Sequence, residues 1–186
     1  NEEEVHPWRA SLKGGTDKPF NIPFLRLWDC FSGSQPDENN RMLSRAPRQR
    51  LRTASVRKET LAMHLDHKIW EPTPYISFQA SAERLEELAN MRNSRGNRGV
   101  QFLTVIDPDT RLRRGFPILD VAAEMRYYGI QDPYGNSNQY YINHYVCLWE
   151  VTGKEVVGHW EWDDLAEYED WYRDIIMPAF RKFRRR

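Results

Sequence analysis

The sequence predicts a single mixed α+β domain over residues 22–165, built around one aromatic-rich core. Two observations predict this class. Short apolar runs typical of strands alternate with segments in which apolar residues recur every three or four positions, as they do in helices. Phe, Trp and Tyr together make up 13% of the chain, and such large side chains bury much area in a compact core. A chain of 186 residues is long enough for one domain of this kind.

The N-terminal part is expected to be an arm followed by the first strand. Residues 1–21 show little periodicity, and we expect this arm to pack only if Trp8 finds a pocket. The strand is predicted over residues 23–28 (PFLRLW), where Arg26 shares a face with two aromatic residues. An arginine in that position is unusual, because an unpaired guanidinium is costly to bury.

Two helices are predicted from their caps in the first half of the domain. Thr53 or Ser55 is expected to cap a helix that runs to about Ile69, and Ser81 to cap a helix that runs through Met91. Further on, a buried strand is predicted at residues 100–106, a short helix at 119–127 and the strongest strand at 142–150, and an extended segment precedes Ser81 at 71–80.

The C-terminal part is expected to contain a hairpin and a helix. Residues 155–160 are predicted to pair with the strand at 142–150. Asp163 or Asp164 is then expected to cap a final helix, whose portion over residues 166–186 packs on the domain or extends from it. Pro178 should kink this helix, because proline lacks the N–H that a helix requires.

Charge and cysteine content exclude some classes of protein and leave others open. Lys plus Arg and Asp plus Glu number 27 each, which argues against a protein that is basic throughout and made for nucleic acid. The two cysteines, Cys30 and Cys147, have no metal-like spacing, and whether they form a disulfide stays open. No apolar run approaches a membrane span, so we expect no membrane partner. The start lacks a signal-peptide core, which favours an intracellular location, although a removed signal would leave no trace.

Familiar catalytic motifs are missing from the sequence. It contains no GxSxG elbow, no phosphate-binding GxxxxGK[ST], no GxGxxG and no HExxH. His64 and His67 are spaced to meet one metal on a helix, but no third ligand is in view. We therefore expect no metal, and interpret this pair as a polar helix face.

Three segments in order carry a resemblance. These are an arginine inside a strand (PFLRLWD), a serine-bearing extended segment that leads into a helix (TPYISFQASAERL), and a long loop that runs into a strand (NQYYINHYVCLWEVTG). Their order resembles the ADP-ribosyltransferases of the cholera-toxin type, which have Arg, Ser-Thr-Ser and Glu-x-Glu at these places. The resemblance implies two small packed antiparallel or mixed sheets, the split sheet of those enzymes, with flanking helices.

A closer resemblance is to a domain family of unknown function that is common in filamentous fungi. Its members have blocks similar to RLWD, TPYISFQAS, FLTVID and NHYVCLWEV. The similarity extends over about residues 22–165, and the middle and last blocks together are fairly specific.

The resemblance implies NAD as the ligand and assigns roles to individual residues. Arg26 would contact the pyrophosphate, for which its planar fork is suited; an ion pair with Asp29 is the alternative. Ser77 would orient the nicotinamide ribose, or be an ordinary strand serine. Tyr75 and Tyr140 would contact the cofactor, and the tyrosines that flank the long loop would stack a nicotinamide, a base or a partner protein, or only anchor the loop.

The position of the catalytic glutamate in that resemblance is occupied by His144. Cleavage of the nicotinamide–ribose bond builds positive charge on the ribose, which a carboxylate stabilises. His144 cannot supply that charge, and Glu150 would lie about 20 Å along the strand. The sequence therefore predicts a catalytically impaired domain that acts as a binding or interaction module, with a protein partner or target expected. An active mono-ADP-ribosyltransferase or NAD glycohydrolase with a rearranged acid is the alternative.

A second, independent signal is the basic run at residues 41–58. Clustered arginines contact phosphate backbones, so nucleic-acid binding is a further alternative. The residues that would carry it are Arg45, Arg48, Arg50 and Arg52. The acidic stretch at residues 161–174 could offset this charge within the fold, and we favour a solvated surface.

Overall fold

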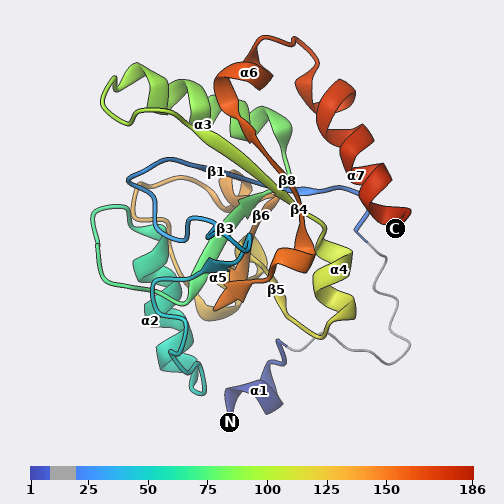
Figure 1. The fold of residues 1–186 in the computed structure, drawn as a ribbon. Helices are drawn as coiled ribbons and strands as arrows, with labels where there is room; N and C mark the ends of the chain where they lie inside the picture. The colour runs from blue at the N-terminus through green and yellow to red at the C-terminus, as the bar shows by residue number, and fades with distance from the viewer. Residues whose placement is uncertain (9–19) are drawn as a thin grey trace.

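A computed structural model describes residues 1–8 and 20–186; residues 9–19 of the arm predicted over residues 1–21 lie outside them. Six strands form one sheet, in the order β5-β6-β3-β1-β4-β8, and β2 and β7 form a second small sheet. The strands are β1 (Phe24–Trp28), β2 (Met42–Leu43), β3 (Tyr75–Gln79), β4 (Phe102–Ile106), β5 (Ile118–Asp120), β6 (His144–Leu148), β7 (Glu150–Val151) and β8 (Val156–Glu161). Together with the helices they confirm the predicted α+β class (Figure 1).

The six-stranded sheet divides where β1 meets β3. β1 pairs with β4 along its whole length, but with β3 only where Leu25 faces Gln79. The Phe24 ring of β1 stacks on the Tyr145 ring of β6, with centroids 4.6 Å apart. In a flat sheet these two strands would be separated by about 9–10 Å. The two rings meet across β3 on one face of the sheet, in a hydrophobic cluster that also contains Phe78.

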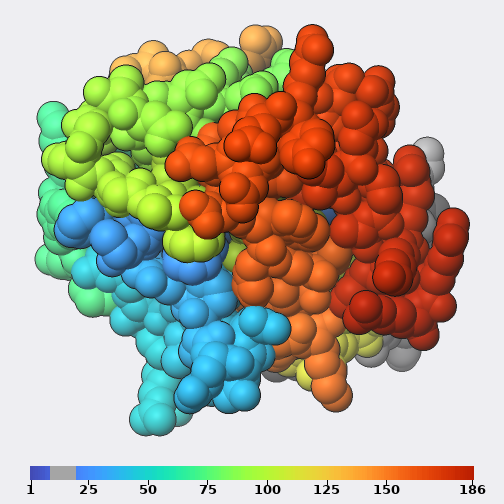
Figure 2. All heavy atoms as spheres, turned by 45° about the horizontal axis from the view of Figure 1, so that its top comes forward, coloured from blue at the N-terminus to red at the C-terminus, as the bar shows by residue number. Residues whose placement is uncertain are grey.

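Three hydrophobic clusters follow this division. The cluster on the face where these two rings meet includes Phe24, Ile76 and Phe78. Helices α2 (Ala54–Leu65) and α5 (Val121–Tyr128) cover the outer face of the half formed by β3, β6 and β5. On the other half, α3 (Ala82–Ser94) and α6 (Trp162–Ala166) cover β1 and β4. Figure 2 shows α3, in green, beside the C-terminal segment, in red.

The predicted caps of α2 and α3 are confirmed. The side chain of Thr53 accepts a hydrogen bond from the Val56 N–H, and that of Ser81 accepts one from the Arg84 N–H, each at 3.2 Å. Such caps satisfy backbone donors that have no partner inside the helix. α2 ends at Leu65, four residues before the predicted end at Ile69.

Several short helices were not predicted. They are α1 (Glu2–Val5), α4 (Pro108–Arg113) and the 3-10 helices η1 (Asn138–Tyr141) and η2 (Gly153–Glu155). α4 begins at the Asp107–Pro108 pair, which we expected only to end a strand. Asp107 caps it and Pro108 occupies its first turn, where proline needs no N–H partner.

The predicted hairpin between residues 142–150 and 155–160 is wrong. β6 pairs with β3 and β5, whereas β8 pairs with β4 in the other half of the sheet. The chain turns away after β6 because Trp149 adopts a left-handed backbone, with φ of 64°. β7 then pairs with β2, and η2 directs the chain to β8.

The final helix is interrupted. α6 ends at Ala166, and a π-helical turn (Tyr172–Ile176) leads into α7 (Met177–Arg184). Pro178 lies in the first turn of α7, so the helix accommodates it at the junction with the π-helical turn and not by a kink within one continuous helix.

The N-terminal segment packs as predicted, because Trp8 is buried. The Arg57 guanidinium lies 3.7 Å from the centroid of the Trp8 ring, and the Trp8 Nε1–H donates to the Glu124 carboxylate at 3.0 Å. Both cysteines are free, Cys30 exposed and Cys147 buried, so no disulfide joins them.

Candidate functional site

Arg26 lies at the point where β1 and β3 separate. Its Nη1 donates to the Ser77 carbonyl oxygen at 3.1 Å, and its Nη2 donates to the Gly33 carbonyl oxygen at 2.7 Å. The guanidinium thus binds a carbonyl that the β1–β3 ladder leaves free. Its Nε is buried and has no hydrogen-bond partner among the described residues. An orphaned donor on a charged side chain is costly, and a ligand acceptor would satisfy it.

The charge of Arg26 has no counterion within the described part of the chain. The alternative ion pair with Asp29 is not formed, because Asp29 binds Arg98 with an N–O distance of 2.6 Å. Burial, with Arg92 nearby, lowers the pKa of Arg26 to about 10, so the side chain remains charged at neutral pH. The site therefore carries an uncompensated positive charge, which favours an anionic ligand.

Ser77 forms a hydrogen-bonded chain that we did not predict. Its Oγ lies 2.7 Å from His64 Nε2, and His64 Nδ1 lies 2.7 Å from Thr73 Oγ1. Burial, together with His144 and Arg26 nearby, lowers the pKa of His64 to about 3. His64 is therefore a neutral imidazole. One of its ring nitrogens donates a hydrogen bond to one hydroxyl, and the other nitrogen accepts a hydrogen bond from the second hydroxyl.

His144 lies close to Ser77 on the neighbouring strand. It faces Gln79 across the β3–β6 ladder, and Ser77 is two residues from Gln79 on the same strand face. The Tyr141 ring stacks on the His144 ring, with centroids 5.8 Å apart. Burial, with His67 nearby, lowers the pKa of His144 to about 4, so it too is neutral. The structure thus places Arg26, Ser77 and His144 on three neighbouring strands.

Three exposed aromatic side chains lie in the chain segments that precede Ser77 and His144. Tyr140 and Tyr134 are about half exposed, and Trp70 has 76% of its surface exposed. The Arg84 guanidinium lies 5.1 Å from the centroid of the Tyr140 ring, and the Tyr134 hydroxyl accepts a hydrogen bond from the His67 N–H at 2.9 Å. Exposed rings of this kind can stack on flat ligand groups.

Tyr75 is not among these exposed side chains, contrary to our assignment of it as a cofactor-binding residue. Its ring is buried in the core against α2, and its hydroxyl shares a hydrogen bond with the Thr60 hydroxyl at 2.7 Å. α2 covers the face of β3 to which Tyr75 points. We therefore leave it out of the proposed site.

No carboxylate hydrogen-bonds Arg26, His64, Ser77 or His144 within residues 1–8 and 20–186. Glu150, the carboxylate downstream on the strand, pairs with Arg41 at 2.7 Å. Asp132 is connected to His144 through Tyr141: the Asp132 carboxylate accepts a hydrogen bond from the Tyr141 hydroxyl, and the Tyr141 ring stacks on His144. The site thus contains hydroxyls, neutral imidazoles and a guanidinium.

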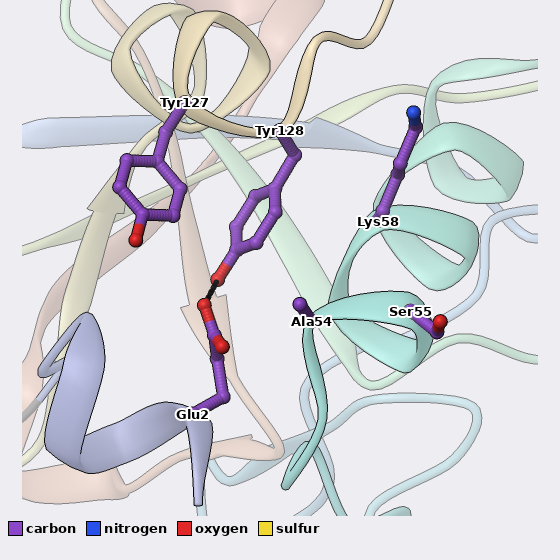
Figure 3. Close-up of a pocket in the computed structure, with 6 residues that line it drawn as sticks. All are labelled: Glu2, Ala54, Ser55, Lys58, Tyr127 and Tyr128. Carbon is purple, nitrogen blue, oxygen red and sulfur yellow. Dashed lines mark hydrogen bonds between the residues drawn. The ribbon is translucent and has the colours of Figure 1, made fainter.

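Two surface cavities lie away from these residues. One, of about 460 Å³, is lined by Glu2, Ala54, Ser55, Lys58, Tyr127 and Tyr128 (Figure 3). The Glu2 carboxylate accepts a hydrogen bond from the Tyr128 hydroxyl there, at 2.9 Å. The other, of about 280 Å³, is lined by Arg41, Leu43, Pro47, Arg48, Trp149 and Glu150.

The basic run at residues 41–58 does not form one uniform surface. Arg45, Arg48, Arg50 and Arg52 are exposed, as nucleic-acid binding would require. Arg57 is buried, however, and donates to the Leu51 and His6 carbonyls and to Glu3. Arg45 donates to the Trp70 carbonyl oxygen at 2.9 Å, so part of the run has a structural role.

Neither a metal site nor a membrane span was found in the described residues. No group of three or more His, Cys, Asp or Glu side chains among residues 1–8 and 20–186 is arranged to hold a metal ion. In the same residues, no helix has the length and the apolar composition that crossing a bilayer requires.

A family model described as a domain of unknown function (DUF7587) matches residues 24–165, which include every strand of the described residues and Arg26, Ser77 and His144. None of the curated proteins matches the chain.

Proposed function

Because the chain belongs to the DUF7587 family, whose function is unknown, we propose a function from the site itself. The domain binds the ADP-ribosyl part of NAD or of a related ligand, and it turns NAD over slowly or not at all. It acts as a binding module, in which Arg26 contacts the pyrophosphate and Ser77 contacts the adjoining ribose.

The observation that carries this proposal is the unsatisfied Nε of Arg26. Arg26 is half-buried and has no counterion among the described residues, its Nη1 donates to the Ser77 carbonyl oxygen, and its buried Nε keeps a donor without a partner. A phosphate oxygen would satisfy that donor and neutralise the charge. Arginine suits phosphate, because its planar donors form charge-assisted hydrogen bonds in fixed directions.

The polar groups beside Arg26 suit a sugar. Ser77 and His64 form a neutral hydrogen-bonded pair at 2.7 Å, and His144 is neutral on the next strand. Neutral donors and acceptors bind ribose hydroxyls without requiring a charge on the ligand. The exposed ring of Tyr140 lies close by in the chain and supplies a face for a base.

The same residues account for the slow turnover that we propose. Departure of nicotinamide leaves a ribose with positive charge, which a carboxylate would stabilise. His144 is neutral at the position that we align with that carboxylate. The loss of one such electrostatic stabiliser commonly lowers the rate by about 10²- to 10³-fold.

Isothermal titration of the protein with ADP-ribose tests the proposal. Arg26→Gln should weaken binding by about 10- to 100-fold, since a hydrogen bond to a charged group contributes about 1.5–3 kcal/mol. Arg48→Gln, an exposed arginine outside the site, is the matched control and should bind as the wild type does.

Because Arg26 also holds the Ser77 carbonyl, Arg26→Gln could weaken the fold itself. Ser77→Ala leaves that carbonyl in place and should weaken binding, while the melting temperature falls by only a few degrees because the His64 imidazole loses one hydrogen bond. Wild-type affinity in both variants would refute the proposal. Nicotinamide released from NAD by the wild type, and lost in Arg26→Gln, would instead make the domain an active enzyme.

A further inference from the structure

We infer that the site discriminates against the positively charged nicotinamide ring of oxidised NAD, and that its ligands are ADP-ribose and ADP-ribosyl groups without that cation. This inference rests on the proposed function and names the ligand class of the same site. It follows from the charges that the described residues place around Ser77.

The charged side chain that contacts Ser77 is positive. Arg26 has no carboxylate partner, and Arg92, on α3, lies close enough to disfavour its charge further. The Arg92 Nη1 donates to the Leu27 carbonyl oxygen at 3.1 Å, which holds that second guanidinium against β1. Because the Asp29 carboxylate lies near Arg92 and favours its charge, the uncompensated positive charge of the site is that of Arg26. This charge attracts the pyrophosphate of a dinucleotide and repels a cation bound beside it.

The groups expected to contact the nicotinamide ribose provide no compensating negative charge. His64 and His144 are neutral, and Ser77 has an uncharged hydroxyl. The Asp132 carboxylate is engaged by the Tyr141 hydroxyl and by the Asn136 N–H, the latter at 2.7 Å. The hydroxyl end of Tyr141 thus bonds Asp132 while the ring stacks on His144, and the Asp132 carboxylate has no hydrogen bond to Arg26, Ser77 or His144 among the described residues.

One of the exposed aromatic rings, Tyr140, already lies against a cation. A ring can stabilise a cation that lies over its face. At Tyr140 that interaction is already made by Arg84, whose guanidinium lies 5.1 Å from the ring centroid. Arg84 thus adds a further positive charge beside Tyr140.

Reduced and oxidised NAD form a matched pair of probes, because they differ in the charge of the nicotinamide ring and share the rest of the molecule. Titration of the wild type should give ADP-ribose and reduced NAD similar affinities. Oxidised NAD should bind about tenfold more weakly, the factor expected when like charges meet at several ångströms in a partly buried site.

A change of charge at His144 should reverse this order. His144→Glu places a carboxylate where the cation would lie, so oxidised NAD should bind as tightly as reduced NAD or more tightly. His144→Gln is the neutral control and should keep the wild-type preference. Asp132→Asn should also leave the preference unchanged, because that carboxylate is turned away.

The outcomes separate this inference from the proposed function. If the wild type binds oxidised NAD as tightly as reduced NAD, the inference is wrong and the proposed function stands. If none of the three ligands binds, the proposed function is wrong, and the inference falls with it. The comparison in the wild type decides the matter even if His144→Glu does not fold.

Discussion

The buried neutral histidines predict that the domain loses stability in mild acid. Burial lowers the pKa of His64 from 6.5 to about 3 and that of His144 from 6.5 to about 4. Between the lowered and the ordinary values, the unfolded chain binds a proton at each position that the folded chain does not. Stability from these two groups is therefore complete above about pH 6.5 and falls as the pH decreases below it.

The size of the effect follows from the shifts. When the pH is lowered from about 7.5 to about 5, the unfolding free energy should fall by about 2 kcal/mol for each histidine that stays neutral in the folded protein. We propose urea unfolding at both pH values for the wild type and for His64→Gln, which keeps a donor and an acceptor but does not titrate. The variant should lose about 2 kcal/mol less than the wild type over this range.

Comparison of the two proteins removes the contribution of the other titrating groups. Asp29 and Asp132, whose pKa values are lowered by their hydrogen bonds despite the opposing effect of burial, titrate alike in both. Equal losses in the two proteins would refute our account of His64. So would an NMR titration in which the His64 ring takes up a proton near pH 6.5.

Two further predictions concern other parts of the chain. Glu155→Gln should destabilise the fold by about 3–5 kcal/mol in urea unfolding, because Arg111, buried and 2.9 Å from that carboxylate, would keep its charge without a counterion; a loss below about 1 kcal/mol would contradict this. Reversing the charges at Arg45, Arg48, Arg50 and Arg52 should leave ADP-ribose affinity unchanged, and the wild type should not measurably bind RNA at physiological salt. A wild-type RNA complex that weakens steeply with salt and is lost in the reversed set would make the basic run the functional surface.

Local sequence signals predicted the parts of the fold that depend on neighbouring residues. Thr53 and Ser81 cap their helices because the hydroxyl and the N–H that it accepts from are three residues apart. The strand that contains Arg26 was also predicted, and Trp8 was identified as the residue on which packing of the arm depends. In each case the chemistry that decides the structure lies within a few residues or in one large apolar side chain.

Features that depend on distant residues were missed. The hairpin was wrong because the pairing of β6 and β8 is decided by β3 and β4, far away in the sequence. The alternation of side chains along the strand indicates which residues share a face with Tyr75, but it does not show that α2 covers that face.

The role of His64 was missed for a similar reason. It lies on α2 and bonds Ser77 on β3, and only the packing of that helix on that strand brings the two together. The available signal was a histidine on the helix directly before the serine segment. We interpreted it as part of a polar helix face, because we considered it only with His67 as a metal pair.

The most direct test of the central claim is a crystal structure of the protein soaked with ADP-ribose. Our account predicts a pyrophosphate oxygen within about 2.7–3.2 Å of Arg26 Nε, with a ribose hydroxyl at Ser77. Ligand density elsewhere on the molecule, with the Arg26 Nε still unpartnered, would contradict it.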